Sequence, residues 1–338
     1  MRYFCTYFDL NYLPRGLALY RSLLRTCPRF RLWILCMDDG CYDTLTRLHL
    51  PHVEVISLEE FERGDAELLA AKSTRSKLEY YFTCTPSLPL YVLSRWAAVD
   101  VMTYLDADLY LFSDVAPVFR DFENCSIGIT AHRFPPSLRH LEEYGLYNVG
   151  WLMFRNNQEG VACLEWWRRR CLEWCYDRSD GGRFADQKYL DEWPARFPGT
   201  RILEHPGLNA APWNLADSVV HRTAQGVLIN GQPLLCFHFH GFKRIWSWLY
   251  EPNLSEYRVR LGPAIRKGIY QPYLEEMSGI ESELRAMSIP AASSANVTRG
   301  VSETSFVHWS VRQVRRWLRI FRGTIMRQYL IHMNGRVL

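Results

Sequence analysis

Two acidic side chains one residue apart, Asp106 and Asp108, directly follow the apolar run of residues 99–105. Such a run predicts a buried β-strand, and in open α/β sheets ligands gather where the strands end. Carboxylates are ligands that Mg²⁺ and Mn²⁺ prefer, with ligand phosphate oxygens completing the shell. The tripeptide Asp106-Ala107-Asp108 therefore predicts a divalent cation that neutralises a diphosphate leaving group. The alternative is a solvated turn or helix cap, the usual role of such a tripeptide in a loop.

The same acidic tripeptide begins a set of family motifs. Tyr104-Leu105-Asp106-Ala107-Asp108 resembles the metal motif of A-type-fold glycosyltransferases, particularly family 8, the galactosyltransferase and glycogenin group. Three later segments resemble that family in the same order: Asn148-Val149-Gly150 its Asn-x-Gly strand, Phe184-Ala185-Asp186-Gln187 its Asp-Gln motif, and residues 238–246 its His-x-x-Gly-x-x-Lys-Pro-Trp motif. The resemblance covers about residues 2–246. Arg244-Ile245-Trp246 replaces Lys-Pro-Trp, which indicates a divergent member.

For the metal, the resemblance implies that His238 joins Asp106 and Asp108 in holding Mn²⁺ or Mg²⁺. An imidazole beside two carboxylates suits Mn²⁺ somewhat better. His240 competes with His238, because the two share one face of a strand. We prefer His238 because Gly241 follows three residues later, as in the motif. The alternative for His238 is a histidine of the core or of a strand edge.

For the donor, the resemblance implies a nucleotide sugar whose base, most plausibly uracil, contacts the first-strand segment Thr6, Tyr7 and Asp9. The alternative there is a strand end followed by a helix cap. Lys243 or Arg244 would hold the diphosphate, since both are cationic. Further donor-site candidates are Asn148 for the sugar, Gly241 of the late motif, and one of Lys72, Arg75 and Lys77, with Arg75 the chosen one, for the phosphates or sugar. Gly150 would allow close backbone approach.

For catalysis, the resemblance implies that Asp186 and Gln187 lie beside the anomeric carbon of the transferred sugar. The family retains anomeric configuration, and a front-face route needs only positioning and charge stabilisation. The alternative for Asp186 is an N-terminal cap of a helix that begins near Gln187.

Alternating strands and helices must position these side chains. Apolar strands are predicted at residues 2–8, 31–37, 53–56, 99–105, 126–131, 147–154 and 234–239, and helices at 12–25, 42–48, 58–95 and 160–176. This alternation is typical of a mostly parallel sheet covered by helices. We therefore expect an α/β domain with the nucleotide-diphospho-sugar transferase (A-type) fold, in which helices flank a central mixed, mostly parallel sheet.

The C-terminal part of the chain differs in composition. We expect a catalytic domain at residues 1–290, a linker at 291–305 and a basic amphipathic helical tail at 306–338, with one helix over 306–331. From residue 291 onward the sequence contains eight Arg and one acidic residue, Glu303. An Arg-rich amphipathic helix with Trp309 and Trp317 favours peripheral contact with an anionic membrane. The alternative is that its apolar stripe packs on the catalytic domain.

Composition bounds the remaining options. The net charge of the whole chain is only +4, so we expect no nucleic-acid partner. Ten Cys without a Cys-x-x-Cys pair indicate reduced, mostly buried thiols. We find neither a signal peptide nor eighteen consecutive apolar residues, so we expect a cytoplasmic protein that can lie on the inner face of the cytoplasmic membrane.

Together these features predict a metal-dependent hexosyltransferase. We expect its donor to be a nucleotide sugar, a UDP-sugar, and its acceptor to be a glycan or glycolipid in bacterial surface polysaccharide or lipopolysaccharide assembly. One alternative is a sugar-nucleotide pyrophosphorylase, which would need a Gly-rich basic loop after the first strand. Residues 9–14 contain no glycine. The other alternative is a non-catalytic nucleotide-sugar binding module.

Overall fold

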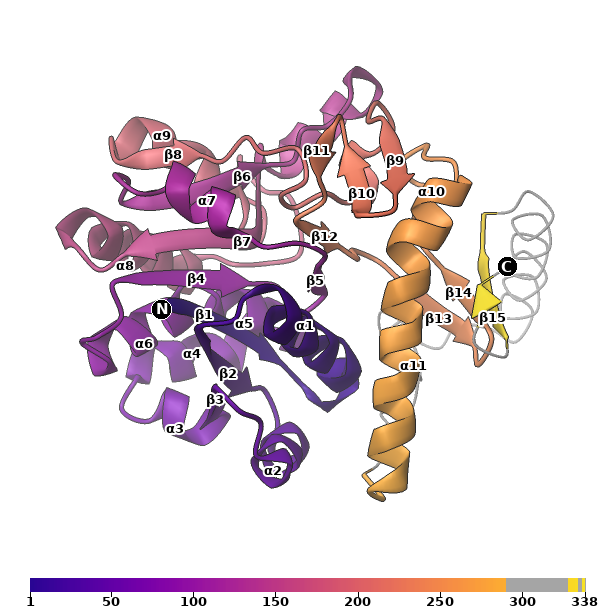
Figure 1. Cartoon of the computed structure of the whole chain (residues 1–338). Helices are drawn as coiled ribbons and strands as arrows, with labels where there is room; N and C mark the ends of the chain where they lie inside the picture. Colours follow the sequence, from indigo (N-terminus) through magenta and orange to yellow (C-terminus); the bar gives the residue numbers. More distant parts are fainter. Residues whose placement is uncertain (290–327, 334–335, 338) are drawn as a thin grey trace, which may run out of the picture.

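The computed structural model describes residues 1–289, 328–333, 336 and 337 (Figure 1). The strands are β1 Arg2–Phe8, β2 Phe30–Cys36, β3 Val53–Ser57, β4 Val101–Leu105, β5 Leu109–Leu111, β6 Ile127–Ala131, β7 Tyr147–Arg155, β8 Thr200–Ile202, β9 Val220–Thr223, β10 Gly226–Ile229, β11 Gln232–Pro233, β12 Cys236–His238, β13 Lys243–Trp246, β14 Leu249–Glu251, β15 Leu330–Met333 and β16 Arg336–Val337. The helices are α1 Leu13–Thr26, α2 Asp39–Leu48, α3 Leu58–Glu62, α4 Ala66–Thr74, α5 Lys77–Cys84, α6 Ser87–Arg95, α7 Ala116–Asp121, α8 Gln158–Glu173, α9 Trp193–Arg196, α10 Pro263–Ile265 and α11 Gln271–Ala286.

The central sheet has seven strands in the order β3-β2-β1-β4-β7-β6-β8. β1, β2, β3 and β4 are parallel, and β6 is parallel to β8, whereas β7 runs antiparallel to both β4 and β6. The carboxyl ends of β1, β4 and β6 therefore meet the amino end of β7 at one edge. Residues that follow these three strands, and residues that begin β7, must lie near one another.

The sheet is buried on both faces because its strands are apolar on both. Phe4, Ile34 and Leu105 point into a cluster with α1, α2, α7 and α11. Cys5 and Trp33 point into the opposite cluster, which contains α3 to α6, α8 and α9. Figure 1 shows the strands of this sheet one above another, from β8 near the top of the view to β3 near the bottom. Strands buried on both sides are near-continuous apolar runs, as the sequence has them.

A short two-stranded ribbon brings distant segments together at the carboxyl edge of the sheet. β5 directly follows Asp108 and pairs antiparallel with β12, with Leu109 opposite His238. The backbone N–H of Phe239 also donates to the carbonyl of Asp108 at 2.9 Å. The ribbon thus joins residues about 130 positions apart, and it places the last residue of β12 beside the acidic tripeptide.

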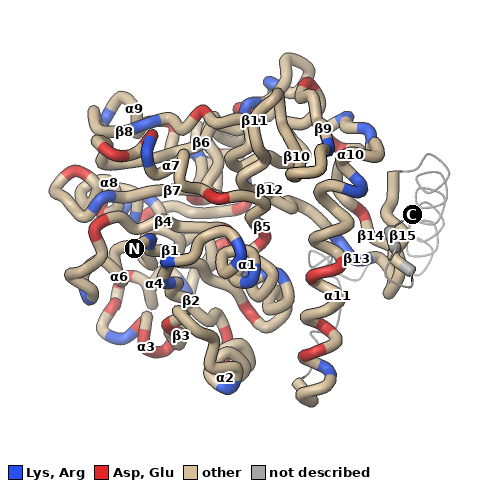
Figure 2. The backbone as a smooth tube through the Cα atoms, viewed as in Figure 1, with Lys and Arg blue, Asp and Glu red and all other residues tan. Residues whose placement is uncertain are grey.

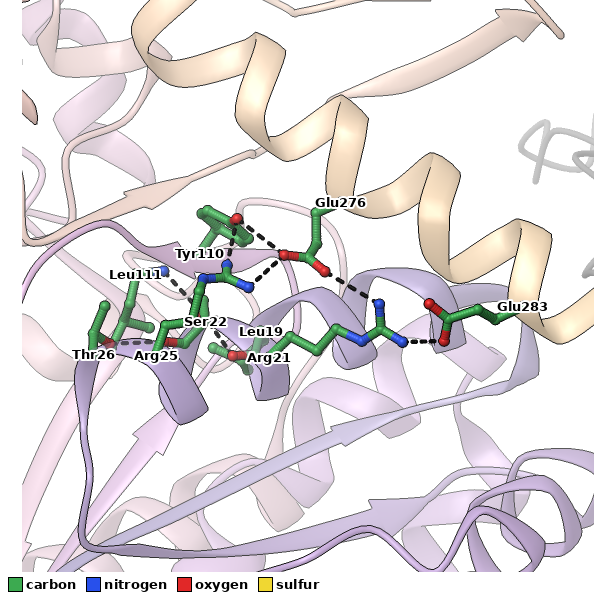
Figure 3. Close-up of polar contacts among 9 residues, drawn as sticks. All are labelled: Leu19, Arg21, Ser22, Arg25, Thr26, Tyr110, Leu111, Glu276 and Glu283. Carbon is green, nitrogen blue, oxygen red and sulfur yellow. Dashed lines mark hydrogen bonds and ion pairs between the residues drawn. The ribbon is translucent and has the colours of Figure 1, made fainter. Parts of the chain in front are cut away.

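α11 lies across α1 at the side of the sheet, as Figures 1 and 3 show. Charged side chains on the two helices hold this contact. Glu276 accepts hydrogen bonds from Arg21 at 3.3 Å and from Arg25 at 2.6 Å, and Arg21 also pairs with Glu283. Tyr110 of β5 joins the same cluster, because its hydroxyl lies 2.5 Å from Arg25 and 3.3 Å from Glu276. α11 is therefore tied both to α1 and to the ribbon.

The predicted fold class is confirmed, and the predicted strands all form. The mostly helical stretch predicted over residues 58–95 is confirmed and consists of four helices, α3 to α6. The predicted linker at 291–305 and most of the predicted helix at 306–331 lie outside the described residues. The end of that helix prediction is wrong, because Leu330 and Ile331 belong to β15, which pairs with β14.

Two further expectations concern the cysteines and membrane spans. All ten cysteines lie in the described part of the chain; none forms a disulfide and nine are buried, as predicted. Within the described ranges, no helix combines the length and apolar character that crossing a bilayer requires.

Candidate metal and donor site

The predicted metal ligands converge at the carboxyl end of β4. One ligand atom each of Asp106, Asp108 and His238 lies within 4.8 Å of the others. The Nε2 atom of His238 is 3.0 Å from Asp108 and 3.6 Å from Asp106. Two carboxylate oxygens and one imidazole nitrogen are a donor set that fits Mn²⁺ or Mg²⁺. The carboxylates are 29% and 13% exposed but the imidazole only 4%, so a ligand would approach from the carboxylate side.

Second-layer hydrogen bonds orient this ligand set. The hydroxyl of Tyr104 donates to Asp106 at 2.8 Å. The Nδ1 atom of His238 lies 3.2 Å from the side-chain oxygen of Asn209, so His238 donates there and presents Nε2 to the carboxylates. A partner that fixes the imidazole tautomer is the usual support of a metal-binding histidine. The sequence analysis did not find Asn209, which lies in a loop without periodic pattern.

Gly150 is required by the position of His238. A Cβ atom at Gly150 would lie 2.6 Å from Nδ1 of His238 and 2.7 Å from the side-chain oxygen of Asn148. Any larger residue would therefore push the imidazole out of place. Asn148 completes the layer, because its side-chain oxygen accepts from the N–H of Gly150 at 2.9 Å and from Asn209 at 2.9 Å. Asn148 thus helps to hold Gly150 and Asn209 in place beside His238.

The charges of the three ligands depend on one another. Burial raises the pKa of Asp106. For Asp108 burial acts in the same direction, but His238 and Arg15 outweigh it and hold the pKa well below its usual range. Burial lowers the pKa of His238, but Asp108 outweighs it and raises the pKa overall. Without an ion, a proton on His238 compensates the paired carboxylates, and a divalent cation would replace that proton.

Asp186 and Gln187 lie on the same edge of the sheet. Asp186 is 5% exposed, and burial raises its pKa to about 7, with the charge of Asp106 acting in the same direction. Gln187 is held from two sides: its amide donates to the carbonyl of Tyr144 at 3.0 Å, and its oxygen accepts from Asn148 at 3.2 Å. The 3-10 helix Lys188–Glu192 has no side-chain cap, so the capping alternative for Asp186 is wrong.

The backbone just before Asp186 is strained. Ala185 has φ +46°, a left-handed conformation that residues with a Cβ rarely adopt. The indole N–H of Trp167 donates to the carbonyl of Asp186 at 2.8 Å and helps to hold this conformation. Strained residues that the surroundings hold in place cluster at functional sites. The strain therefore indicates that the surrounding fold fixes the backbone of Asp186 and Gln187.

The predicted base-binding segment is only partly accessible. Thr6 is fully buried, which leaves no side-chain surface for a ligand. The hydroxyl of Tyr7 is 3.1 Å from that of Thr85, whose side chain also bonds Asp186. Asp9 caps the 3-10 helix Leu10–Tyr12 by accepting from the N–H of Tyr12 at 3.1 Å. Lys77 pairs with Asp9 at 2.8 Å, which ties α5 to the end of β1.

The cationic candidates separate by their partners. Arg244 pairs with Glu281 of α11 at 2.7 Å. Lys243 forms no ion pair with any described residue, and neighbouring strand residues point to opposite faces. Burial lowers the pKa of His240, and the charges of His238 and Lys243 lower it further. Glu281 already engages Arg244, and the choice between Lys243 and Arg244 for the diphosphate stays a prediction.

Two other cationic candidates are engaged within the fold. Arg75 stacks on the ring of Tyr176 at 4.1 Å and donates to its hydroxyl at 2.6 Å. Lys72 pairs with Glu62 at 2.7 Å. The guanidinium of Arg75 is thus already engaged with Tyr176, and the predicted contact of Arg75 with the donor stays a prediction. Gly241 has φ +68°, and a side chain there would meet Asn253, so this position requires glycine.

The structure adds Arg15, a cation that the sequence analysis missed. It belongs to the first turn of α1 and lies over the ring of Tyr12 at 4.4 Å. Its guanidinium donates to the carbonyl of Phe242 at 2.6 Å, just after the His-x-x-Gly segment. Its charge helps to lower the pKa of Asp108. Arg15 could have been found in the sequence as a cation at the start of the helix that follows the first strand.

An aromatic group on the far side of His238 was also missed. The ring of Trp213 lies 5.0 Å from His238 and 5.3 Å from His132 in edge-to-face geometry. His132 stacks on Phe134 at 4.7 Å, and burial lowers its pKa to about 3, so its imidazole is neutral. His132 directly follows β6, as Asp106 directly follows β4. This shared position at a strand end could have marked His132 in the sequence.

One hollow of the described structure lies away from these residues. It measures about 1040 Å³ and lies among α3, α4, α6 and α8, where Arg168 pairs with Asp65. It contains none of the predicted site residues. The chemistry therefore has to be sought at the sheet edge, where the carboxylates and the late histidine meet.

No protein-family model matches the chain. It is 30% identical to the uncharacterized protein YfnD of Bacillus subtilis (strain 168) over 308 residues, which cover 90% of this chain and 98% of YfnD. It is also 30% identical to the uncharacterized protein YfnF of the same organism over 248 residues, 71% of this chain and 81% of YfnF.

Among solved structures, the galactosyltransferase LgtC in complex with donor and acceptor sugar analogs has a TM-score of 0.53 and 14% sequence identity. The match covers 84% of this chain and 99% of that chain. At this identity the likeness establishes the fold alone, which is the A-type glycosyltransferase fold. The low identity fits the divergence predicted from the altered Lys-Pro-Trp motif.

Proposed function

This chain belongs to the family of the Bacillus subtilis proteins YfnD and YfnF, and we propose that it is a metal-dependent glycosyltransferase. One observation carries the proposal: in an A-type fold, Asp106, Asp108 and His238 form a metal-binding set on the same sheet edge as Asp186 and Gln187. Chance would rarely bring five polar residues of three separate segments to one edge.

The donor we propose is a UDP-hexose. Asp106, Asp108 and His238 would hold Mn²⁺ or Mg²⁺, which supplies positive charge to the diphosphate leaving group. Arg15 acts on Asp108 and Lys243 on His240, and both would add positive charge to the site. Tyr7 and Asp9, at the end of β1, are the candidates for contact with uracil.

Sugar transfer with retention needs a held sugar and a dry reaction site. Asn148 and Gln187 share a hydrogen bond, so their remaining polar atoms have fixed directions. Asp186 is buried beside Asp106, where a carboxylate would stabilise positive charge developing at the anomeric carbon. The acceptor hydroxyl belongs to a glycan or glycolipid. For this step we propose that the enzyme works at the inner face of the cytoplasmic membrane.

The test is incubation with a panel of UDP-sugars and Mn²⁺. Slow UDP release supports a transferase, pyrophosphate release supports a pyrophosphorylase, and binding without turnover supports a non-catalytic module. The double variant Asp106→Asn, Asp108→Asn should lose donor affinity in the presence of the ion. Asp39→Asn with Asp43→Asn, on the exposed side of α2, is the matched control and should behave as wild type. Equal donor affinity in both double variants would refute the proposal.

A thermal-shift screen gives an independent reading. A ligand that binds only the folded state raises the melting temperature by mass action. The expected result is a larger rise for UDP-sugars with Mn²⁺ than for either alone. A rise that is the same with and without the ion would contradict metal dependence.

A further inference from the structure

Positive charge is concentrated in one segment of the described chain. Residues 219–270 contain seven Lys or Arg and two Glu, whereas residues 1–218 contain 24 Lys or Arg and 29 Asp or Glu. Lys243 and Arg244 have been described above. The other five are Arg222, Arg258, Arg260, Arg266 and Lys267. None of these five forms an ion pair with another described residue.

Arg258 and Arg260 line a groove of about 480 Å³. Val259 between them is buried, so both arginines point outward from the same short segment. Val220 and Ile265 give the groove an apolar floor. Arg258 has φ +59°, which is uncommon for a residue with a Cβ. Its orientation is thus held by the fold, at some cost in backbone energy.

The other three cations extend this groove. Arg222 is two residues after Val220 on β9, so both side chains are on one face of that strand. A Cβ atom built on Gly268 would lie 3.7 Å from Cδ of Arg222, so the arginine stem runs along the π-helix Arg266–Tyr270. Arg266 and Lys267 begin that helix. Figure 2 shows the resulting positive charge around β9 and α10.

The groove leads toward the metal ligands. Tyr257 immediately precedes Arg258, and its ring lies 6.4 Å from the rings of both Trp213 and His240. Trp213 in turn contacts His238 at 5.0 Å. Two aromatic side chains thus separate the arginine groove from the site. Tyr257 thus connects the groove to His240 and Trp213, whose rings both lie beside that of His238.

We propose that these five cations bind the acidic part of the acceptor, a glycan that carries carboxylate or phosphate groups; this rests on the proposed function. Guanidinium groups match planar carboxylates and phosphates in bidentate geometry. The apolar floor suits the faces of sugar rings. A hollow with cations at its rim fits a chain-like ligand better than a flat bilayer, which would require apolar side chains on a protruding face.

The test measures binding directly, without donor or metal. The probe is a fluorescein-labelled hyaluronan octasaccharide, a carboxylated glycan, and neutral maltooctaose competes in a parallel arm. The groove variant is Arg258→Glu with Arg260→Glu. The control is Arg29→Glu with Arg31→Glu. It reverses two exposed charges that are also two residues apart, but at the start of β2. Both variants should retain the wild-type melting temperature.

We expect the groove variant to bind hyaluronan about tenfold more weakly or worse, and the control to stay within about twofold of wild type. Maltooctaose should not displace the probe. Three outcomes overturn the proposal: no hyaluronan binding by the wild type, equal affinity in wild type and groove variant, or equal losses in both double variants. A groove variant that instead loses binding to phosphatidylcholine–phosphatidylglycerol vesicles would show a membrane surface.

The proposed function fails separately from this inference. The thermal-shift screen with nucleotide sugars depends on the carboxylates and not on the groove. A wild type that ignores every nucleotide sugar but needs Arg258 and Arg260 for hyaluronan would refute the transferase and leave an acidic-glycan binding protein. The converse result would leave a transferase with an acceptor of another class.

Discussion

At the scale of single residues, Gly150 and His238 depend on each other, because the imidazole occupies the space that a side chain at position 150 would need. We expect Gly150→Ala to displace His238 and lower Mn²⁺ affinity about 10- to 100-fold, as the loss of a supporting contact does at other metal sites. Titration calorimetry with Mn²⁺ measures the change.

The matched control is Gly279→Ala, since Gly279 lies within α11 and a Cβ there meets nothing within 4 Å. This change should leave Mn²⁺ affinity unchanged and stabilise the helix by about 0.5–1 kcal/mol. If Gly150→Ala binds Mn²⁺ as wild type does, His238 is not the ligand.

The buried carboxyl of Asp186 makes a prediction about stability. Its pKa is raised to about 7 in the folded protein, against about 3.9 in an unfolded chain. The folded state therefore favours the protonated form, so its contribution is fully present below about pH 4 and is lost as the pH rises to about 7. Asp186→Asn removes this dependence. Between pH 5 and pH 8, with EDTA present, the variant should gain about 2–3 kcal/mol in unfolding free energy relative to wild type.

Urea unfolding at the two pH values measures this difference, and Asp43→Asn on the exposed face of α2 is the control. A pH-independent difference between Asp186→Asn and wild type would contradict the buried-carboxyl assignment. The same substitution should abolish transfer, so that stability rises where activity falls, as is common at functional sites.

At the scale of elements, α11 is linked to the metal-site ribbon through charges that Figure 3 shows. Glu276 is 13% exposed and accepts from Arg21, Arg25 and Tyr110. Glu276→Gln would leave Arg25 without its charge partner and Arg21 with Glu283 alone, and we expect a loss of about 1–2 kcal/mol in unfolding free energy. Glu275→Gln is the control, because Glu275 bonds only Gln271 on the same helix and is exposed. Similar losses for both substitutions would exclude the cluster as the cause.

Strands and helices whose apolar residues recur at a regular spacing were predictable from the sequence. Strands that form only by pairing with a segment far away in the sequence were not. The run that becomes β4 and the alternation of α1 were visible in the sequence because burial needs only apolar residues at the right spacing. β5 and β12 are three residues each, too short for a period, and they pair only because the chain returns across the sheet edge. Leu330 and Ile331 continue an apolar pattern of helical spacing, yet they pair with β14, a tertiary contact that overrides local preference.

The same distinction holds for the site. Asp106, Asp108, Asp186, Gln187 and His238 were predicted because they belong to motifs of fixed spacing. Asn209 and Trp213 support them from an irregular loop, and no local pattern marks such residues. Only the folded chain shows that both contact His238.

At the scale of the whole molecule, the charge changes sign along the chain. An acidic body, the basic segment 219–270, the acidic helix α11 and the basic end of the chain follow one another in sequence. From the sequence we predict that residues 306–331 contact anionic membrane. Arg312→Glu, Arg315→Glu and Arg319→Glu together should weaken binding to phosphatidylglycerol vesicles about tenfold or more. Vesicle co-sedimentation measures this, and the Arg29→Glu, Arg31→Glu protein serves as the control. Unchanged sedimentation of the triple variant would remove the membrane from the account.

The pairing of β15 with β14 has a practical consequence for anyone who shortens this polypeptide. A stop codon anywhere before residue 330 removes the third strand of the order β13-β14-β15-β16 and leaves a bare edge beside the strand that carries Lys243. Bare edges recruit other chains, so such truncations should precipitate for reasons unrelated to lipids. Deletions aimed at the arginine-rich stretch should be internal, and purification tags belong at the amino terminus.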